Sequence, residues 1–430
     1  MIRALVVLVL LSMPSLAEAQ ARAPYLQRPT EDSIVIAWRT VAAEPTRVCW
    51  GTSATSLTNS AGSGASETNH VVTITGLAAD TQYAYATGRA SCPGGAADPR
   101  DTFRTAPVRG STDPFRMWVV GDSGTGGARQ AAVRDAMLAA TTDRRPDLFL
   151  HMGDMAYDTG TTGQFDGRFF GMYADILRHT ACWPTMGNHE GANSDSPTQS
   201  GPYYDAYVLP TDGSAGGLAS GTEAYYAFDW GNVHFVVLDS HDTPRGTAGA
   251  MLTWLDADLA ATDQQWVIVY FHHPPYTDGS HDSDTESQLR QMRENALPII
   301  EAHGVDAVLA GHSHIYERSY LLRGAYDTPT TAGGHVVDTG DGRLDGDGAY
   351  RSGADGTLYV VAGHGGASVG GSGNHPVMFF SELQHGSCII DVDGGQLTMR
   401  NVRWDGVESD HVTLVKGDGL FLSSPFTSVT

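Results

Sequence analysis

Positively charged residues are scarce in this sequence. Its 430 residues include 26 lysines and arginines against 49 aspartates and glutamates, and Lys416 is the single lysine. The formal net charge of −23 excludes a protein that binds nucleic acid or an anionic membrane through a basic surface. Such an acidic chain could bind an anionic substrate only where metal ions make the field locally positive.

Cysteine is also rare. The four cysteines are Cys49, Cys92, Cys182 and Cys388, and none has the Cys-X-X-Cys spacing of a thiolate zinc site. An exported chain would permit disulfides. Cys49 and Cys92 lie in the same amino-terminal region and could pair, whereas a pair between Cys182 and Cys388 is left open.

Long apolar runs are absent after the first residues of the chain. No later segment is long and apolar enough to be a transmembrane helix. Residues 1–19 contain Arg3, the apolar run Ala4–Leu11 and then Ala17-Glu18-Ala19, which is typical of a cleavable signal peptide. We therefore expect a secreted or periplasmic protein whose mature chain begins at or near Gln20.

The amino-terminal part of the sequence is rich in predicted strands. Within residues 21–107, short runs such as Ser33–Trp38 and Gln82–Thr87 alternate with period two and are separated by glycine, serine and asparagine. This spacing is typical of an all-β immunoglobulin-like or fibronectin-like sandwich. The region holds no constellation of catalytic residue types, so we expect a structural or docking role.

The remaining sequence alternates between predicted strands and helices. Residues 108–114 are polar and contain glycine and proline, which indicates a linker. The strand Phe115–Val120 and the helix-like Ala128–Ala140 then begin an α/β domain that we expect to extend over residues 115–405. Residues 406–430 are expected to form a carboxy-terminal tail.

Five predicted strands of this domain are followed by polar residues of metal-ligand type. The first residues of this kind after the strands are Asp122, Asp154, Asn188, His272 and His312. In α/β folds ligands bind at the carboxyl ends of the strands. Oxygen ligands together with imidazoles suit iron, manganese or zinc. A hydrophobic core has no need of these residues, so the pattern predicts a metal site.

The five blocks in order resemble the signature of a known superfamily. They are Gly121–Gly124, Gly153–Tyr157, Gly187–Glu190, Val269–His272 and Gly311–His314. This order is similar to that of the dinuclear metallophosphoesterases, also called calcineurin-like phosphoesterases. Tyr157 and the run Gly-His-Ser-His-Ile-Tyr-Glu-Arg resemble the purple acid phosphatases within it. The resemblance implies a four-layer αββα sandwich, and residues 21–107 resemble the fibronectin type III-like domain of plant-type members.

The resemblance also implies a dinuclear metal centre. It assigns the first ion to Asp122, Tyr157 and His314, the second to Asn188, His272 and His312, and gives Asp154 to both. A tyrosinate suits Fe(III), so the first site is expected to hold ferric iron and the second Fe(II), Zn(II) or Mn(II). His273 adjoins His272, but Val269 and Pro274 fall where the family pattern places them if His272 is the ligand.

Two further histidines match catalytic positions of the family. His189 and His281 are expected to contact the phosphate or the leaving group, where an imidazole can stabilise charge or donate a proton. One position departs from the family pattern. His364 stands where the family commonly has asparagine, so the role of its loop is left open.

The expected function is that of an exported acid phosphatase. Two metal ions and a metal-bound hydroxide would hydrolyse small phosphate monoesters. The alternatives are a phosphodiesterase or phytase with the same metal core, or a non-catalytic phosphate-binding or adhesion protein. A non-catalytic relative should have lost a ligand, and none is missing. We expect no nucleic-acid or membrane partner, and the oligomeric state is left open.

Overall fold

The amino-terminal strands form two antiparallel sheets. The computed structural model describes residues 20–88, 91–92, 101–329, 333–352 and 356–417, so the expected signal peptide lies outside the described residues. One sheet has the order β1 (Gln20–Gln27), β2 (Ser33–Pro45), β5 (Ser66–Thr75). The other has the order β4 (Asn59–Ala61), β3 (Val48–Gly51), β6 (Gln82–Thr87), β7 (Thr102–Arg104). Their inward side chains form one apolar cluster, as expected for a fibronectin-like sandwich.

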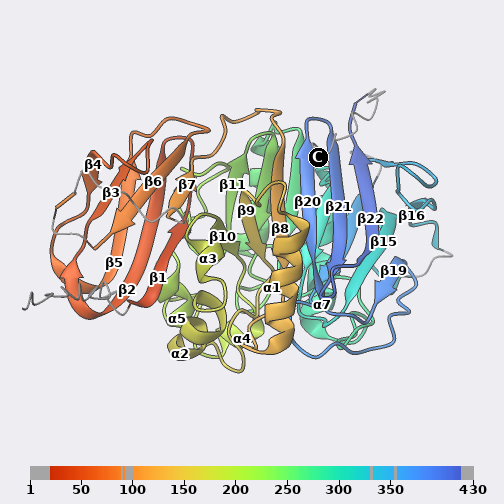
Figure 1. Ribbon diagram of the computed structural model, residues 1–430. Helices are drawn as coiled ribbons and strands as arrows, with labels where there is room; N and C mark the ends of the chain where they lie inside the picture. Colours follow the sequence, from red (N-terminus) through yellow and green to blue (C-terminus); the bar gives the residue numbers. More distant parts are fainter. Residues whose placement is uncertain (1–19, 89–90, 93–100, 330–332, 353–355, 418–430) are drawn as a thin grey trace, which may run out of the picture.

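The α/β part is built on two larger sheets that lie face to face (Figure 1). The seven-stranded sheet has the order β10 (Ala181–Pro184), β9 (Leu148–His151), β8 (Phe115–Val120), β20 (Gly386–Asp393), β21 (Gln396–Arg403), β22 (Glu408–Val415), β17 (Tyr350–Arg351). The eight-stranded sheet has the order β11 (Tyr226–Trp230), β12 (Val233–Val237), β13 (Trp266–Tyr270), β14 (Ala307–Ala310), β18 (Thr357–Ala362), β15 (Tyr316–Leu322), β16 (Val336–Asp338), with β19 (Met378–Glu382) paired to β15. Trp183 of one sheet stacks on Phe228 of the other, with ring centroids 3.9 Å apart.

Helices cover the outer faces of both sheets. α1 (Ala128–Ala140) packs on the seven-stranded sheet, and α6 (Ala250–Ala261) and α8 (Leu297–Ala302) pack on the eight-stranded one. Shorter elements are α2 (Thr162–Gln164), the π-helix η1 (Phe165–Phe170), α3 (Ala174–Leu177), α4 (Asn188–Gly191), α5 (Pro202–Ala206), α7 (Ser287–Gln291) and the π-helix η2 (Met292–Ala296). The expected four-layer αββα sandwich is thus confirmed.

The strand pairing corrects one expectation and answers a question that the sequence left open. Residues Glu408–Val415 fall in the segment expected as a tail, yet they form β22 and pair with β21. Cys182 on β10 and Cys388 on β20 are separated by two intervening strands, and both are free and buried. Cys49 and Cys92, which the sequence allows to pair, form a disulfide.

The amino-terminal sandwich contacts the segment that follows β9. Arg22 forms an ion pair with Asp166 of η1 at 2.9 Å, and the Tyr25 hydroxyl donates to the Ala206 carbonyl at 2.8 Å. Tyr25 also packs on Phe170, with ring centroids 4.6 Å apart. The interface combines apolar packing with buried polar contacts, which favours a fixed arrangement. No helix in the described part of the chain has the length and apolar character needed to cross a membrane.

Candidate metal centre

The candidate ligands lie in loops at one edge of the two sheets. Seven side chains of ligand type follow the strands in this order: Asp122 after β8, Asp154 and Tyr157 after β9, Asn188 after β10, His272 after β13, and His312 and His314 after β14. At Asp122, Asp154 and His312 the backbone φ is 55°, 57° and 63°. Residues other than glycine seldom adopt this conformation, and such residues cluster at functional sites.

Glycines allow these loops to approach one another closely. A Cβ atom on Gly187 would lie 2.2 Å from Asp154 Oδ1. A Cβ atom on Gly153, where φ is +89°, would lie 2.6 Å from His272 Nδ1. Neither position has room for a larger side chain, so glycine in these blocks is required by close packing of the ligand loops.

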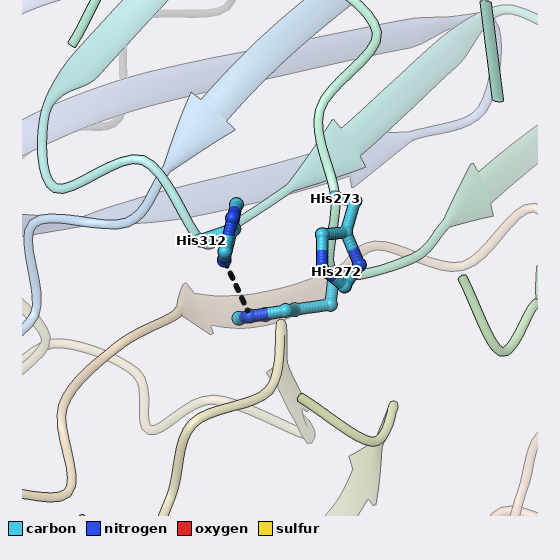
Figure 2. Close-up of side chains that lie close together, drawn as sticks. All are labelled: His272, His273 and His312. Carbon is cyan, nitrogen blue, oxygen red and sulfur yellow. Dashed lines mark hydrogen bonds between the residues drawn. The ribbon is translucent and has the colours of Figure 1, made fainter. Parts of the chain in front are cut away.

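Three donor atoms converge between the ends of β10, β13 and β14. Asn188 Oδ1 lies 3.0 Å from His272 Nε2 and 2.9 Å from His312 Nδ1, and the two nitrogens are 3.2 Å apart. Figure 2 shows the rings of His272 and His312 steeply inclined to each other, with a dashed line joining the two nitrogens. His272 Nδ1 donates to the Met152 carbonyl at 2.7 Å, which leaves the lone pair of the neutral ring on Nε2. In the neutral rings these lone pairs point at one another, an arrangement that a cation between them would stabilise.

A second set of donor atoms meets a few ångströms away. The Tyr157 hydroxyl lies 3.2 Å from Asp122 Oδ1 and 3.1 Å from His314 Nε2. His314 Nε2 is in turn 3.6 Å from Asp122 Oδ1. His314 Nδ1 faces the Ser368 carbonyl at 3.1 Å, so the same tautomer argument directs the Nε2 lone pair into the site.

Asp154 lies between the two sets. Its Oδ2 is 3.5 Å from His272 Nε2, and ligand atoms of Asp122, Asp154 and His272 lie within 4.8 Å of one another. Burial raises the pKa of Asp122 well above its ordinary value. The pKa of Asp154 is lowered instead, because the charge of His272 outweighs the effect of burial. Burial lowers the pKa of His272, but Asp154 and Asp122 outweigh it and raise the pKa to about 9. Two buried carboxylates this close therefore need positive charge beside them.

The two histidines expected to contact substrate lie at the rim of this cluster. His189 Nε2 is 3.8 Å from Asp154 Oδ2, and its ring lies 4.1 Å from the Tyr157 ring. The His281 ring stacks on His312 with centroids 3.8 Å apart. Their side chains are 30% and 32% exposed, against 0–8% for Asp154, His272 and His312. Both can therefore reach a ligand from solvent.

The other histidines near the expected motifs have partners of their own. His273 Nδ1 forms a hydrogen bond with Ser240 Oγ at 2.9 Å. Its ring also lies beside that of His312 (Figure 2). Burial, followed by neighbouring imidazoles, lowers its pKa well below the ordinary value. His364 Nε2 lies 2.9 Å from Asn401 Oδ1 and is buried, so its side chain joins its loop to β21.

Two glutamates of the site were missed by sequence reasoning. Buried Glu190 accepts hydrogen bonds from the backbone N–H groups of Asp154, Ala156 and Gly187 at 2.8, 2.9 and 3.0 Å. Glu190 lies three residues after the N-cap position Gly187 and accepts from its N–H, as the glutamate of a capping box does, and this spacing could have identified the residue. Glu286 lies between His281 and His312, and no local signal marks it.

Known proteins resemble both the sequence and the structure. The calcineurin-like phosphoesterase family profile matches residues 115–316. Purple acid phosphatase 22 of Arabidopsis thaliana is 33% identical over 256 residues, which cover 58% of this chain and 53% of that protein. Probable purple acid phosphatase 20 of the same plant is 26% identical over 415 residues, which cover 91% and 85%. The chain thus spans about half the length of the first relative.

A solved structure shares the fold. The purple acid phosphatase from yellow lupin (Lupinus luteus) seeds aligns with a TM-score of 0.65 at 18% identity, covering 95% of this chain and 78% of that chain. The alignment spans both the β-rich and the α/β part of this chain, because it covers 95% of it. The chain therefore carries a calcineurin-like phosphoesterase domain and is a relative of the purple acid phosphatases.

Proposed function

We propose that this protein is a metal-dependent acid phosphatase that hydrolyses phosphate monoesters. The observation that carries the proposal is the convergence of two sets of donor atoms on either side of Asp154. Two ions held there would neutralise the charge of the phosphate and lower the pKa of a bound water. Because the chain as a whole is acidic, an anionic ester is expected to bind where bound metal ions make the field positive, at this edge of the sheets.

The donor set supports a division of the ligands between two ions. We assign Asn188, His272 and His312 to one ion and Asp122, Tyr157 and His314 to the other, with Asp154 shared. The set containing Tyr157 is richer in anionic oxygen, which suits Fe(III). The set with two imidazoles and an amide suits Fe(II), Zn(II) or Mn(II).

His189 and His281 are proposed to act on the substrate directly. Both side chains lie at the open rim, and each has one ring nitrogen held by the protein. His189 Nδ1 faces the Asp158 carbonyl, and His281 Nδ1 faces Glu286. The remaining Nε2 of each ring faces the substrate side, and in the protonated imidazolium form it can donate to a phosphate oxygen or to the leaving group.

Metal removal tests the proposal. Chelation should abolish hydrolysis of p-nitrophenyl phosphate, and restored iron with zinc should recover it with two ions per chain by elemental analysis. Faster hydrolysis of p-nitrophenyl phosphate than of bis(p-nitrophenyl) phosphate or phytate would support the monoesterase assignment. A chelated protein that keeps full activity, or a preference for the diester or phytate, would contradict it.

We also propose that the chain is exported, with residues 1–19 as its signal peptide. The disulfide between Cys49 and Cys92 supports this, because such bonds persist in oxidising compartments. Amino-terminal sequencing of the protein recovered outside the cytoplasm should begin at or near Gln20. Recovered protein that retains Leu5–Leu11 would contradict the proposal.

A further inference from the structure

One carboxylate contacts both a candidate ligand and a candidate catalytic histidine. The two oxygens of Glu286 lie 2.9 and 3.0 Å from His281 Nδ1, and Oε2 lies 3.7 Å from His312 Nε2. The rings of His281 and His312 stack with an interplanar angle of 28°. Ligand atoms of all three side chains fall within 4.8 Å of one another.

The backbone holds Glu286 in this place. Glu286 is the residue that precedes the first turn of α7, and its Oε1 accepts a hydrogen bond from the Asp282 N–H at 3.2 Å. Asp282 directly follows His281 in the chain. The carboxylate is therefore fixed to the same loop that carries His281, so the two side chains are held as one unit.

The contact with His312 bears on metal binding. His312 Nδ1 points toward Asn188 and His272, as described above, so Nδ1 is the atom that would bind an ion. Its lone pair must then be free, which places the proton of the neutral ring on Nε2, the nitrogen nearest Glu286. A carboxylate at the second nitrogen of a metal-binding histidine fixes the tautomer and makes the ligand more basic.

The contact with His281 bears on the substrate. A proton on Nδ1 held by Glu286 leaves Nε2 as the only ring nitrogen that can exchange a proton with a ligand. The ring is also confined on one face by His312. Without Glu286 the ring could rotate and present either nitrogen, so the productive orientation would be lost for part of the time.

We propose that Glu286 is a positioning residue shared by the metal centre and by His281, an inference that rests on the proposed phosphatase function. It holds His312 in the tautomer that binds the second ion. It holds His281 with Nε2 directed at the leaving group. Loss of this single carboxylate should therefore weaken metal binding and leaving-group protonation together.

The first test measures zinc affinity. Metal-free protein is titrated with Zn(II) against a chromophoric chelator, for wild type, Glu286→Ala and Glu286→Gln. We expect a loss of about 10–100-fold in affinity for the alanine variant, the range found for carboxylates behind metal-binding histidines. The glutamine variant keeps one acceptor oxygen and should lose less. Glu294→Ala is the matched control, because Glu294 is 47% exposed and forms a surface ion pair with Arg290.

The second test measures leaving-group dependence. Glu286→Ala should slow turnover of an alkyl phosphate more than that of p-nitrophenyl phosphate, whose leaving group needs no proton. In a His281→Ala background the Glu286 substitution should change this ratio no further, because its effect passes through His281. Circular dichroism establishes that each variant is folded, and Glu286→Gln serves if the alanine variant is not.

The outcomes separate the two proposals. If Glu286→Ala and Glu286→Gln bind zinc like wild type, or keep the wild-type ratio between the two esters, the shared role of Glu286 is overturned. The phosphatase function still stands in that case, provided that the wild type turns over. If the wild type hydrolyses neither ester, the proposed function fails. The zinc titration alone then decides whether Glu286 supports a metal ligand.

Discussion

Replacing Glu190 with alanine should destabilise the protein by a large fraction of its total stability. The Glu190 carboxylate is fully buried and accepts three backbone hydrogen bonds, two at Oε2 and one at Oε1. Alanine would leave three buried N–H groups without a partner, at a cost of about 1–3 kcal/mol each. The total of about 3–9 kcal/mol compares with the roughly 5–15 kcal/mol that stabilises a typical domain.

Glutamine at this position gives a graded comparison. The side-chain oxygen of Glu190→Gln can serve the N–H groups of Asp154 and Gly187, while its amide faces the Ala156 N–H. One donor is then unsatisfied, so we expect a loss of about 1–3 kcal/mol.

The assay is urea unfolding of metal-free protein followed by circular dichroism, so that metal binding does not contribute. Glu294→Gln is the surface control and should lie within about 0.5 kcal/mol of wild type. The reasoning fails if Glu190→Ala also lies within that margin, or if glutamine costs more than alanine.

Three other results are expected. Asp154→Ala should abolish phosphatase activity and lower the metal content, because one carboxylate serves both ions; a fully active variant would rule this out. Iron-loaded protein should show a broad visible band from the Tyr157 phenolate, and Tyr157→Phe should remove it without changing the circular dichroism; a variant that keeps the band would show that Tyr157 is no ligand. Burial lowers the pKa of His234, but hydrogen bonds to Asp229 and Asp258 outweigh it and raise the pKa to about 9 from 6.5. The implied stabilisation of about 3 kcal/mol is complete below pH 6.5 and lost as the pH rises through 9, so His234→Asn should remove that slope from the unfolding free energy.

Local patterns predicted much of the fold and the position of the site. The strands before Asp122, Asp154 and His312 are short apolar runs that are followed by glycine. The polar residues after them indicate the edge of the sheets at which the ligands meet. The amino-terminal sandwich could be predicted in the same way, because buried and exposed residues alternate with period two in single strands such as β5. These features depend on neighbours in the sequence.

Other features depend on residues far apart in the chain, and no local pattern reveals them. β22 could not be distinguished from a tail because its alternation is interrupted, and it is identified as a strand by its pairing with β21 and β17. Whether Cys182 and Cys388 form a disulfide could not be decided without the strand order, which places two strands between them. Glu286 looks like an ordinary polar residue before a helix, and its contacts with His281 and His312 follow from the turn that folds the loop back.

The position of β20 has a consequence for how the chain must be made. β20 lies between β8 and β21, and Cys388 on β20 is the cross-strand neighbour of Val119 on β8. β8 therefore gains this neighbour only after about 270 further residues have been synthesised. Until then β8 is an edge strand with unpaired backbone groups, and the loop that carries Asp122 lacks β20 as its neighbour on that side. A nascent chain therefore cannot complete its seven-stranded sheet, or the edge of the catalytic core beside Asp122, until β20 has been synthesised.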